Sequence, residues 1–173
     1  MQQPDGIVLR PLAPGDSVDL MTALLHEAYA PLGALGLNYT AVDQSVETTR
    51  ERIAGHECHV AERAGSIVGT ATLHTDDRDR PQCACRPGMA YLSQFAVSPA
   101  FQRSGLGSAL LAHIEARARA LGFTSLALDT AIPATHLVAF YSRRGYATIG
   151  ETRFPRKTYR SVIMAKPLRD NGV

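Results

Sequence analysis

Cysteine is scarce in this sequence and follows no framework spacing. The three cysteines stand at positions 58, 83 and 85, and an odd number of this kind argues against a secreted disulfide scaffold. The pair at positions 83 and 85 lacks the second spaced pair that a structural zinc site usually requires. We therefore expect ordinary thiols and no metal site.

Long apolar runs and a strong net charge are also missing. No segment reaches the length that spans a bilayer, and the residues after Met1 do not form a basic and then apolar signal segment. The 18 basic and 16 acidic residues leave a net charge of +2, which is too small to indicate nucleic acid. We expect a cytoplasmic protein that binds neither membrane nor nucleic acid.

The composition that remains is that of a folded protein. Apolar residues make up 45% of the 173 residues and charged residues 20%, so enough apolar surface is present to offset the chain entropy lost on folding. No repeat or low-complexity tract is visible, and the length suits one core. We expect a single domain over residues 1–173.

Apolar spacing and turn residues predict the elements along the chain. Strands are expected at residues 7–10, 58–62, 67–74, 89–97, 125–129, 146–151 and 161–166, and helices from Asp16 or Ser17 to about residue 29 and at 45–54, 107–121 and 133–144. The order β-α-α-β-β-β-α-β-α-β-β predicts an α/β (α+β) fold with a mixed, mostly antiparallel sheet flanked by helices. Residues 31–39 are expected to form a flexible loop that serves as a lid. On the helix at 107–121, Glu115 is expected on the polar side.

The turn before the helix at 107–121 has the clearest chemistry, and it reads Gln102-Arg103-Ser104-Gly105-Leu106-Gly107-Ser108. The first amides of a helix lack intrahelical partners and lie at the positive end of its dipole, so they bind anions. Two glycines let the main chain approach a pyrophosphate closely, and Arg103 can add a charged contact. The pattern is neither the dinucleotide fingerprint nor a P-loop, and a plain strand–turn–helix connection is the alternative.

Two blocks of the sequence together resemble the GCN5-related N-acetyltransferases. Residues 102–107 match the family's Q/R-x-x-G-x-G/A motif, and Phe140-Tyr141-Ser142-Arg143-Arg144-Gly145-Tyr146 is similar to its F/Y-Y-x-x-x-G-F/Y. The separation of the blocks fits as well, and the resemblance covers nearly the whole chain. It implies an enzyme that moves an acetyl group from acetyl-coenzyme A (acetyl-CoA) to a primary amine of a small molecule, by direct attack in a ternary complex.

The resemblance also implies roles for particular residues. The main chain of Phe95 to Val97 would pair with the pantetheine arm, and an N–H there would stabilise the oxyanion. Tyr141 would be the general acid that protonates the departing thiolate, although a tyrosine at a helix end can also simply pack in the core. The residues implied to contact acetyl-CoA are Phe95, Ala96, Val97, Gln102, Arg103, Ser104, Gly105, Leu106, Gly107, Ser108, His136 and Tyr141.

The sequence departs from the family pattern at two positions. Gln94 stands where the family often has a glutamate that helps to deprotonate the amine, and an amide cannot accept a proton at neutral pH. Ala134 stands where an asparagine is common, and Thr135 or His136 is a candidate substitute. The candidates for a proton relay are Ser93, His74, Glu62 and Asp129.

The acceptor site is expected between the first helices, their loop and the C-terminal strands. Its candidate residues are Tyr29, Tyr39, Ser93, Gln94 and Asp129. The stretch with Arg153, Arg156, Lys157, Tyr159 and Arg160 either meets an acidic group of the substrate or forms a solvated hairpin. A protein lysine or N-terminal acetyltransferase and a non-catalytic acyl-CoA-binding sensor are the alternatives, and the resemblance implies a possible homodimer.

Overall fold

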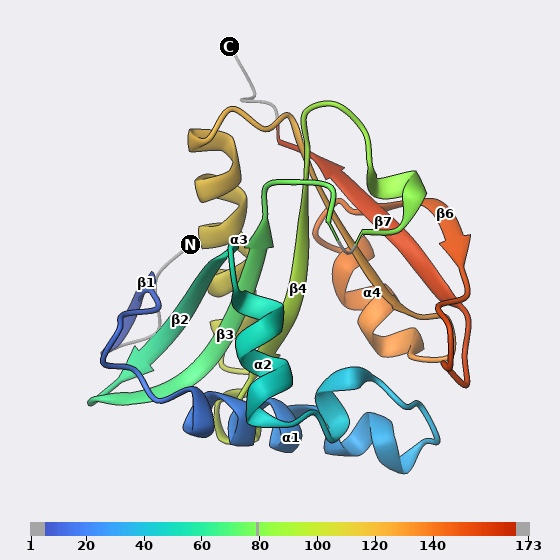
Figure 1. The fold of residues 1–173 in the computed structure, drawn as a ribbon. Coiled ribbons are helices and arrows are strands. Elements are labelled where there is room, and N and C mark those ends of the chain that lie inside the picture. The colour runs from blue at the N-terminus through green and yellow to red at the C-terminus, as the bar shows by residue number, and fades with distance from the viewer. Residues whose placement is uncertain (1–5, 79, 169–173) are drawn as a thin grey trace.

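The computed structural model describes residues 6–78 and 80–168. Within these residues, seven strands form one sheet in the order β1-β2-β3-β4-β5-β7-β6 (Figure 1). The strands are β1 (Ile7–Pro11), β2 (Glu57–Arg63), β3 (Ser66–His74), β4 (Met89–Val97), β5 (Ser125–Ala131), β6 (Ala147–Thr152) and β7 (Ser161–Pro167). β4 and β5 run parallel and the other neighbouring pairs are antiparallel, which confirms the predicted mixed sheet.

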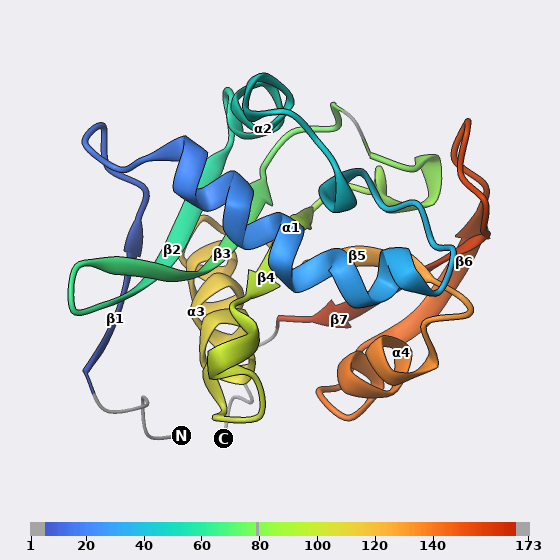
Figure 2. The same cartoon turned by 90° about the horizontal axis from the view of Figure 1, so that it is seen from below.

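Helices cover both faces of this sheet. They are α1 (Val18–Ala34), α2 (Val46–Ile53), α3 (Leu106–Ala120) and α4 (Thr135–Ser142). Figure 2 shows α3 and α4 on one side of the sheet and α2 on the other, and α1 runs along the lower ends of the strands in Figure 1. Short 3-10 turns lie at Thr40–Val42, Gln82–Ala84 and Pro99–Phe101. No described helix combines the length and the apolar character that a membrane crossing needs.

α1 is longer than the sequence predicts and takes up part of the expected lid. The Ser17 hydroxyl caps its start by accepting the Leu20 N–H at 3.2 Å, but the helix continues through Pro31 to Ala34. A proline inside a helix removes one main-chain hydrogen bond, so tertiary packing has to compensate. Leu32 and Leu37 are buried in one cluster, which fixes the end of α1. The prediction of a loop over residues 31–39 was therefore wrong for residues 31–34.

α3 packs its predicted apolar face on the centre of the sheet. Leu110, Leu111 and Ile114 are buried in the largest core cluster. Glu115 was expected on the polar side of this helix, and that prediction was wrong. Its carboxylate is buried, accepts a hydrogen bond from the Tyr146 hydroxyl at 3.1 Å and pairs with the Lys166 ammonium at 2.7 Å. These contacts tie the second half of α3 to β7 and to the residue that precedes β6.

Candidate active site

A β-bulge interrupts β4 near its end, before the turn that leads into α3. Gln94 has a φ of +47°, and the register between β3 and β4 shifts between Thr70 and Thr72. A bulge of this kind re-aims the main-chain groups beside it. The Gln94 side chain is buried: its Oε1 accepts a hydrogen bond from Gln44 Nε2 at 3.0 Å, and its Nε2 donates to Thr72 Oγ1 at 3.4 Å. These hydrogen bonds hold the bulge in its left-handed conformation.

β4 separates from β5 at the bulge. The parallel ladder joins residues 89–92 to residues 125–128, and no described pair continues it to the end of either strand. The end of β4 still pairs with β3, through Ala96 and Val97, and the Tyr29 hydroxyl donates a hydrogen bond to the Phe95 carbonyl at 3.1 Å. The main chain of residues 95–97 therefore borders a gap in the sheet, at the place where the resemblance implies the pantetheine arm.

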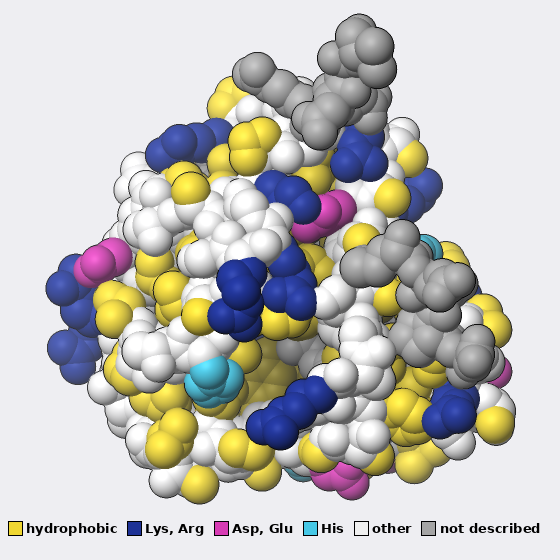
Figure 3. All heavy atoms as spheres, turned by 180° about the vertical axis from the view of Figure 1, so that it is seen from behind, with side chains coloured by type: hydrophobic (Ala, Val, Ile, Leu, Met, Phe, Trp, Pro, Cys, Tyr) yellow, Lys and Arg dark blue, Asp and Glu magenta, His cyan; other side chains and the backbone are white. Residues whose placement is uncertain are grey.

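A groove of about 490 Å³ runs from this gap to the start of α3. Figure 3 shows the hollow on the face opposite to that of Figure 1, with Lys or Arg and His side chains around it. The predicted acetyl-CoA residues that line it are Phe95, Ala96, Val97, Gln102, Arg103, Gly105, Gly107, Ser108, His136 and Tyr141. The two others, Ser104 and Leu106, do not line the groove: Ser104 is exposed and the Leu106 side chain lies in the core. They could contact acetyl-CoA only through their main chain.

The start of α3 has the geometry of an anion site. Gly105 caps the helix with a φ of +89°, and Ala109 is the first residue to donate an intrahelical hydrogen bond, to the Gly105 carbonyl at 3.0 Å. The amides of Gly107 and Ser108 come before that first hydrogen bond, so the helix does not occupy them. The Ser104 hydroxyl donates to the Phe101 carbonyl at 2.6 Å and holds the turn.

Arg144 adds a second cation to the groove, beside the predicted Arg103. Its Nη1 donates to the Phe140 carbonyl at 2.7 Å, its guanidinium lies 3.6 Å from the centre of the Phe140 ring, and its Nε donates to the Ser108 hydroxyl at 3.2 Å. The guanidinium is therefore fixed beside the first turn of α3. Sequence reasoning missed this residue because it occupies a variable position of the second motif.

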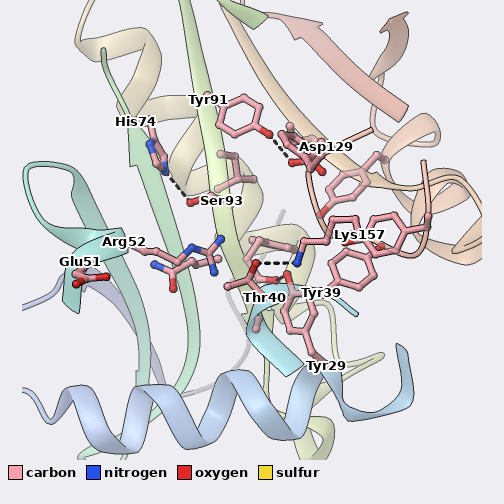
Figure 4. A pocket seen from close by; sticks show the side chains of 18 residues that line it. Tyr29, Tyr39, Thr40, Glu51, Arg52, His74, Tyr91, Ser93, Asp129 and Lys157 are labelled. Carbon is pink, nitrogen blue, oxygen red and sulfur yellow. Dashed lines mark hydrogen bonds between the residues drawn. The ribbon is translucent and has the colours of Figure 1, made fainter. Parts of the chain in front are cut away.

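A second cavity, of about 440 Å³, lies on the side of the sheet that carries α2 (Figure 4). All five predicted acceptor residues line it: Tyr29, Tyr39, Ser93, Gln94 and Asp129. Five residues line this acceptor cavity and the groove as well, namely Tyr29, Tyr39, Phe95, Asp129 and Tyr141. The two spaces therefore meet where β4 and β5 separate.

Asp129, near the end of β5, is the carboxylate at this meeting point. Among the described residues that line either space, the other carboxylate belongs to Glu51, which is exposed and lies in the acceptor cavity alone. Burial raises the pKa of Asp129, and the hydrogen bond that the Tyr91 hydroxyl donates to it opposes this effect. The result is a half-buried carboxylate that takes up a proton more readily than an exposed one.

Tyr141 lies on the other side of the meeting point. It is 7% exposed, and burial raises the pKa of its phenol well above the ordinary value. Its ring centre lies 6.4 Å from that of Phe95, which belongs to the part of β4 that does not pair with β5. The phenol therefore stays protonated at neutral pH, which is the state that a general acid needs.

Two other relay candidates differ in their positions. His74 Nε2 lies 2.7 Å from the Ser93 hydroxyl at the wall of the acceptor cavity, and burial lowers the pKa of His74 to about 3, so this histidine is neutral. Glu62 does not line either space and pairs with Arg10 at 2.6 Å. Glu62 is therefore not brought into the site. No group of three or more possible metal ligands forms among the described residues.

Two cations line the acceptor cavity, and the sequence marked one of them. Lys157 comes from the basic stretch between β6 and β7, whereas Arg52 comes from α2 and carries no motif signal. Tyr159 lines the cavity too, but Arg153, Arg156 and Arg160 do not. Arg160 instead pairs with Glu151 at 2.7 Å on the surface.

Comparison with known proteins defines the class. A model of the Acetyltransferase (GNAT) family matches residues 20–146. A GNAT family acetyltransferase from Elizabethkingia anophelis, solved with acetyl-CoA bound, superimposes with a TM-score of 0.70 over 94% of this chain and 99% of that one, at 18% identity. The fold is thus that of acetyl-CoA-dependent acetyltransferases, and the chain belongs to the GNAT family.

Curated relatives are similar in sequence as well. The S-(2-succino)cysteine N-acetyltransferase of Bacillus subtilis is 29% identical over 160 residues, which cover 91% of this chain and 94% of that protein. An amino-acid acetyltransferase of Neisseria meningitidis is 35% identical over 120 residues, 65% of this chain. The match covers 24% of that longer protein, so the chain spans about a quarter of its length.

Proposed function

We propose that this acetyltransferase moves the acetyl group of acetyl-CoA to the primary amine of a small molecule, by direct attack in a ternary complex. The observation that carries the proposal is that the groove and the acceptor cavity share five lining residues, Tyr29, Tyr39, Phe95, Asp129 and Tyr141, and we call this meeting point the passage. A cavity of about 440 Å³ suits a small molecule, and the names of the two curated relatives are consistent with one.

In this proposal, the groove holds the co-substrate through the residues of this chain. The amides of Gly107 and Ser108, with Arg103 and Arg144, would bind the pyrophosphate. The main chain of residues 95–97 would pair with the pantetheine arm and aim the acyl group at the passage. Acetyl-CoA supplies an activated acetyl group, because the CoA thiolate is a good leaving group.

Three groups of the protein then act on the transfer. Asp129 would accept the ammonium proton, directly or through water, so that a neutral amine forms the new N–C bond. An N–H of the bulged segment, at Phe95 or Val97, would stabilise the negative charge that develops on the acyl oxygen, an effect of roughly 3 kcal/mol for a donor aimed in advance. As the C–S bond breaks, Tyr141 would give its phenolic proton to the departing sulfur, and the second proton that the amine nitrogen loses as the amide forms would restore the phenol.

Replacing Tyr141 with Phe tests this assignment. We expect kcat to fall by about a hundredfold, because a positioned general acid contributes that much or more, while the affinity for CoA stays unchanged. Released thiol and isothermal titration give the two quantities. Tyr146→Phe is the matched control, since Tyr146 is also buried but lines neither space. Equal losses of kcat in both variants would reject the acid role.

A panel of acceptors separates this proposal from its alternatives. Peptides with a free lysine or N-terminal amine would be the better substrates of a protein acetyltransferase, and a sensor would bind CoA without turnover of any amine. We expect small amines to be acetylated with higher kcat/KM than peptides. The homodimer stays a prediction, which light scattering during size-exclusion chromatography tests.

A further inference from the structure

The acceptor cavity contains two cations that the proposed transfer does not use. Arg52 and Lys157 reach into it from opposite sides, from α2 and from the segment between β6 and β7 (Figure 4). Figure 4 shows Asp129 and Tyr91 together in another part of the cavity, beside β5. The half-buried carboxylate of Asp129 therefore lies where the cavity meets the groove, and the two cations lie elsewhere in the cavity, with the exposed Glu51 next to Arg52 on α2.

Hydrogen bonds fix the position of both cations. Arg52 Nη1 donates to Gln44 Oε1 at 2.6 Å, and Gln44 Nε2 in turn donates to the side-chain Oε1 of Gln94, the residue at the bulge. Lys157 Nζ donates to the Asn38 carbonyl at 2.7 Å and to the Thr40 hydroxyl at 3.0 Å. Each charge is therefore held in place relative to β4 and the passage before any substrate arrives.

The electrostatics of the cavity favour an anion between these groups. Burial lowers the pKa of Lys157 and the charges of Arg52 and Arg156 lower it further, whereas the carboxylates of Asp129 and Asp43 act in the opposite direction. The carbonyl and the hydroxyl that accept hydrogen bonds from Lys157 carry no charge. A bound carboxylate would relieve the repulsion between the cations and accept charge-assisted hydrogen bonds from both.

We propose that the acceptor is an amino acid or a close analogue, with its carboxylate between Arg52 and Lys157 and its amine at Asp129. This inference rests on the proposed function and names the substrate class of the same site. A zwitterion matches the order of charges in the cavity, since its ammonium meets the carboxylate at the passage and its carboxylate meets the cations. Arg52 and Lys157 thus select the substrate and position it, without taking part in the proton transfers.

Matched pairs of substrates test the inference. Each of a panel of amino acids, including aspartate and glutamate, is compared with its α-amide and with its decarboxylated amine, and kcat/KM is measured from released thiol. We expect the preferred amino acid to exceed the amine by at least tenfold. Comparing aspartate and glutamate with their side-chain amides shows whether the carboxylate that binds Arg52 and Lys157 is the α-carboxylate or that of the side chain.

Variants connect this preference to the two cations. Arg52→Gln and Lys157→Gln should each raise KM for the amino acid by about tenfold to hundredfold, which is the range of a charge-assisted hydrogen bond, and should leave the decarboxylated amine nearly unaffected. Arg156→Gln is the control, because Arg156 is exposed in the same segment and lines neither space. Thermal stabilisation of the CoA-bound protein by the free amino acid should weaken in the same two variants.

The outcomes separate the two levels of the argument. If carboxylate-free amines are acetylated as well as amino acids, the transfer stands and the carboxylate site is refuted. If Arg52→Gln and Lys157→Gln lower kcat/KM equally for acid and amine, their role is structural and the inference is refuted too. If no amine is acetylated although CoA binds, the proposed function itself fails.

Discussion

Residue by residue, the proposed chemistry depends on two buried acids of different strength. Burial favours the neutral form of both Asp129 and Tyr141 and so raises the pKa of each. For the phenol, the consequence is a proton that stays in place until a sulfur anion forms. For the carboxylate, the consequence is a stronger base, in a chain that has Gln94 where the family resemblance implies a glutamate.

Asp129→Asn removes the base and keeps the shape. The Asn Oδ1 can still accept the Tyr91 hydrogen bond, so the cavity should persist. We expect kcat to fall by about a hundredfold at pH 7, with the loss shrinking at high pH, where the amine arrives neutral. Glu51→Gln is the control, since Glu51 is the exposed carboxylate of the same cavity. A wild-type rate in Asp129→Asn across the pH range would contradict the assignment.

Among the elements, the start of α3 and the bulge of β4 determine where the co-substrate lies. Gly105 has a φ of +89°, and nothing lies within 4 Å of the Cβ position that a side chain there would occupy. A substituent at Gly105 would therefore occupy the open space beside the first amides of the helix. Those amides attract anions and disfavour a negative side chain close by.

Gly105→Glu should weaken CoA binding by roughly a hundredfold or more, because it places bulk and negative charge at the expected pyrophosphate. Gly65→Glu is a closely matched control: its φ is +80°, its Cβ would also meet nothing within 4 Å, and it lies in the turn between β2 and β3. Both variants introduce the same backbone strain and the same charge. A difference in their affinity for CoA, measured by isothermal titration, therefore reports the position of the substitution alone. Equal affinities for CoA would show that the ligand does not approach this turn.

The sequence predicted the elements better than the side chains that complete the site. β4 occupies the residues expected of it, and the turn into α3 lies where two glycines and a helical pattern predicted it. Arg52 could not be predicted, because a basic residue on a short polar helix looks like any solvated one. Its position depends on Gln44 and Gln94, which only the folded chain brings together.

Two failures of prediction have the same physical origin. A proline usually ends a helix, yet α1 continues beyond Pro31 to Ala34, because Leu32 and Leu37 are buried there. Glu115 was placed on the polar side of α3 because a carboxylate is rarely buried, yet Tyr146 and Lys166 satisfy it there. In both cases, partners distant in sequence overrode a local preference.

For the whole molecule, buried neutral histidines make stability depend on pH. In the unfolded chain His74 takes up a proton near pH 6.5, whereas in the folded chain its pKa is about 3. The unfolded state therefore binds more protons between these values, and the free energy of unfolding falls as the pH falls. Burial also lowers the pKa values of His59 and His113, so they act in the same direction.

The free energy of unfolding should fall between pH 7 and pH 5 in both proteins. We expect this fall to be smaller in His74→Gln than in the wild type, by about 1–2 kcal/mol. Urea unfolding at both pH values measures the difference. Ser93→Ala, which removes the partner of His74 and keeps the imidazole, should retain the wild-type pH dependence. An unchanged pH dependence in His74→Gln would mean that this histidine is not the buried neutral group described above.

The central claim is that acetyl passes directly from acetyl-CoA to an amine across the passage between β4 and β5. Initial rates with acetyl-CoA and the preferred amine varied together test it most directly, with mass spectrometry of the protein and product in the same reactions. The account predicts intersecting double-reciprocal lines, one free thiol for each N-acetylated product and no acetyl group on the protein. Parallel lines with an acetylated protein would contradict it.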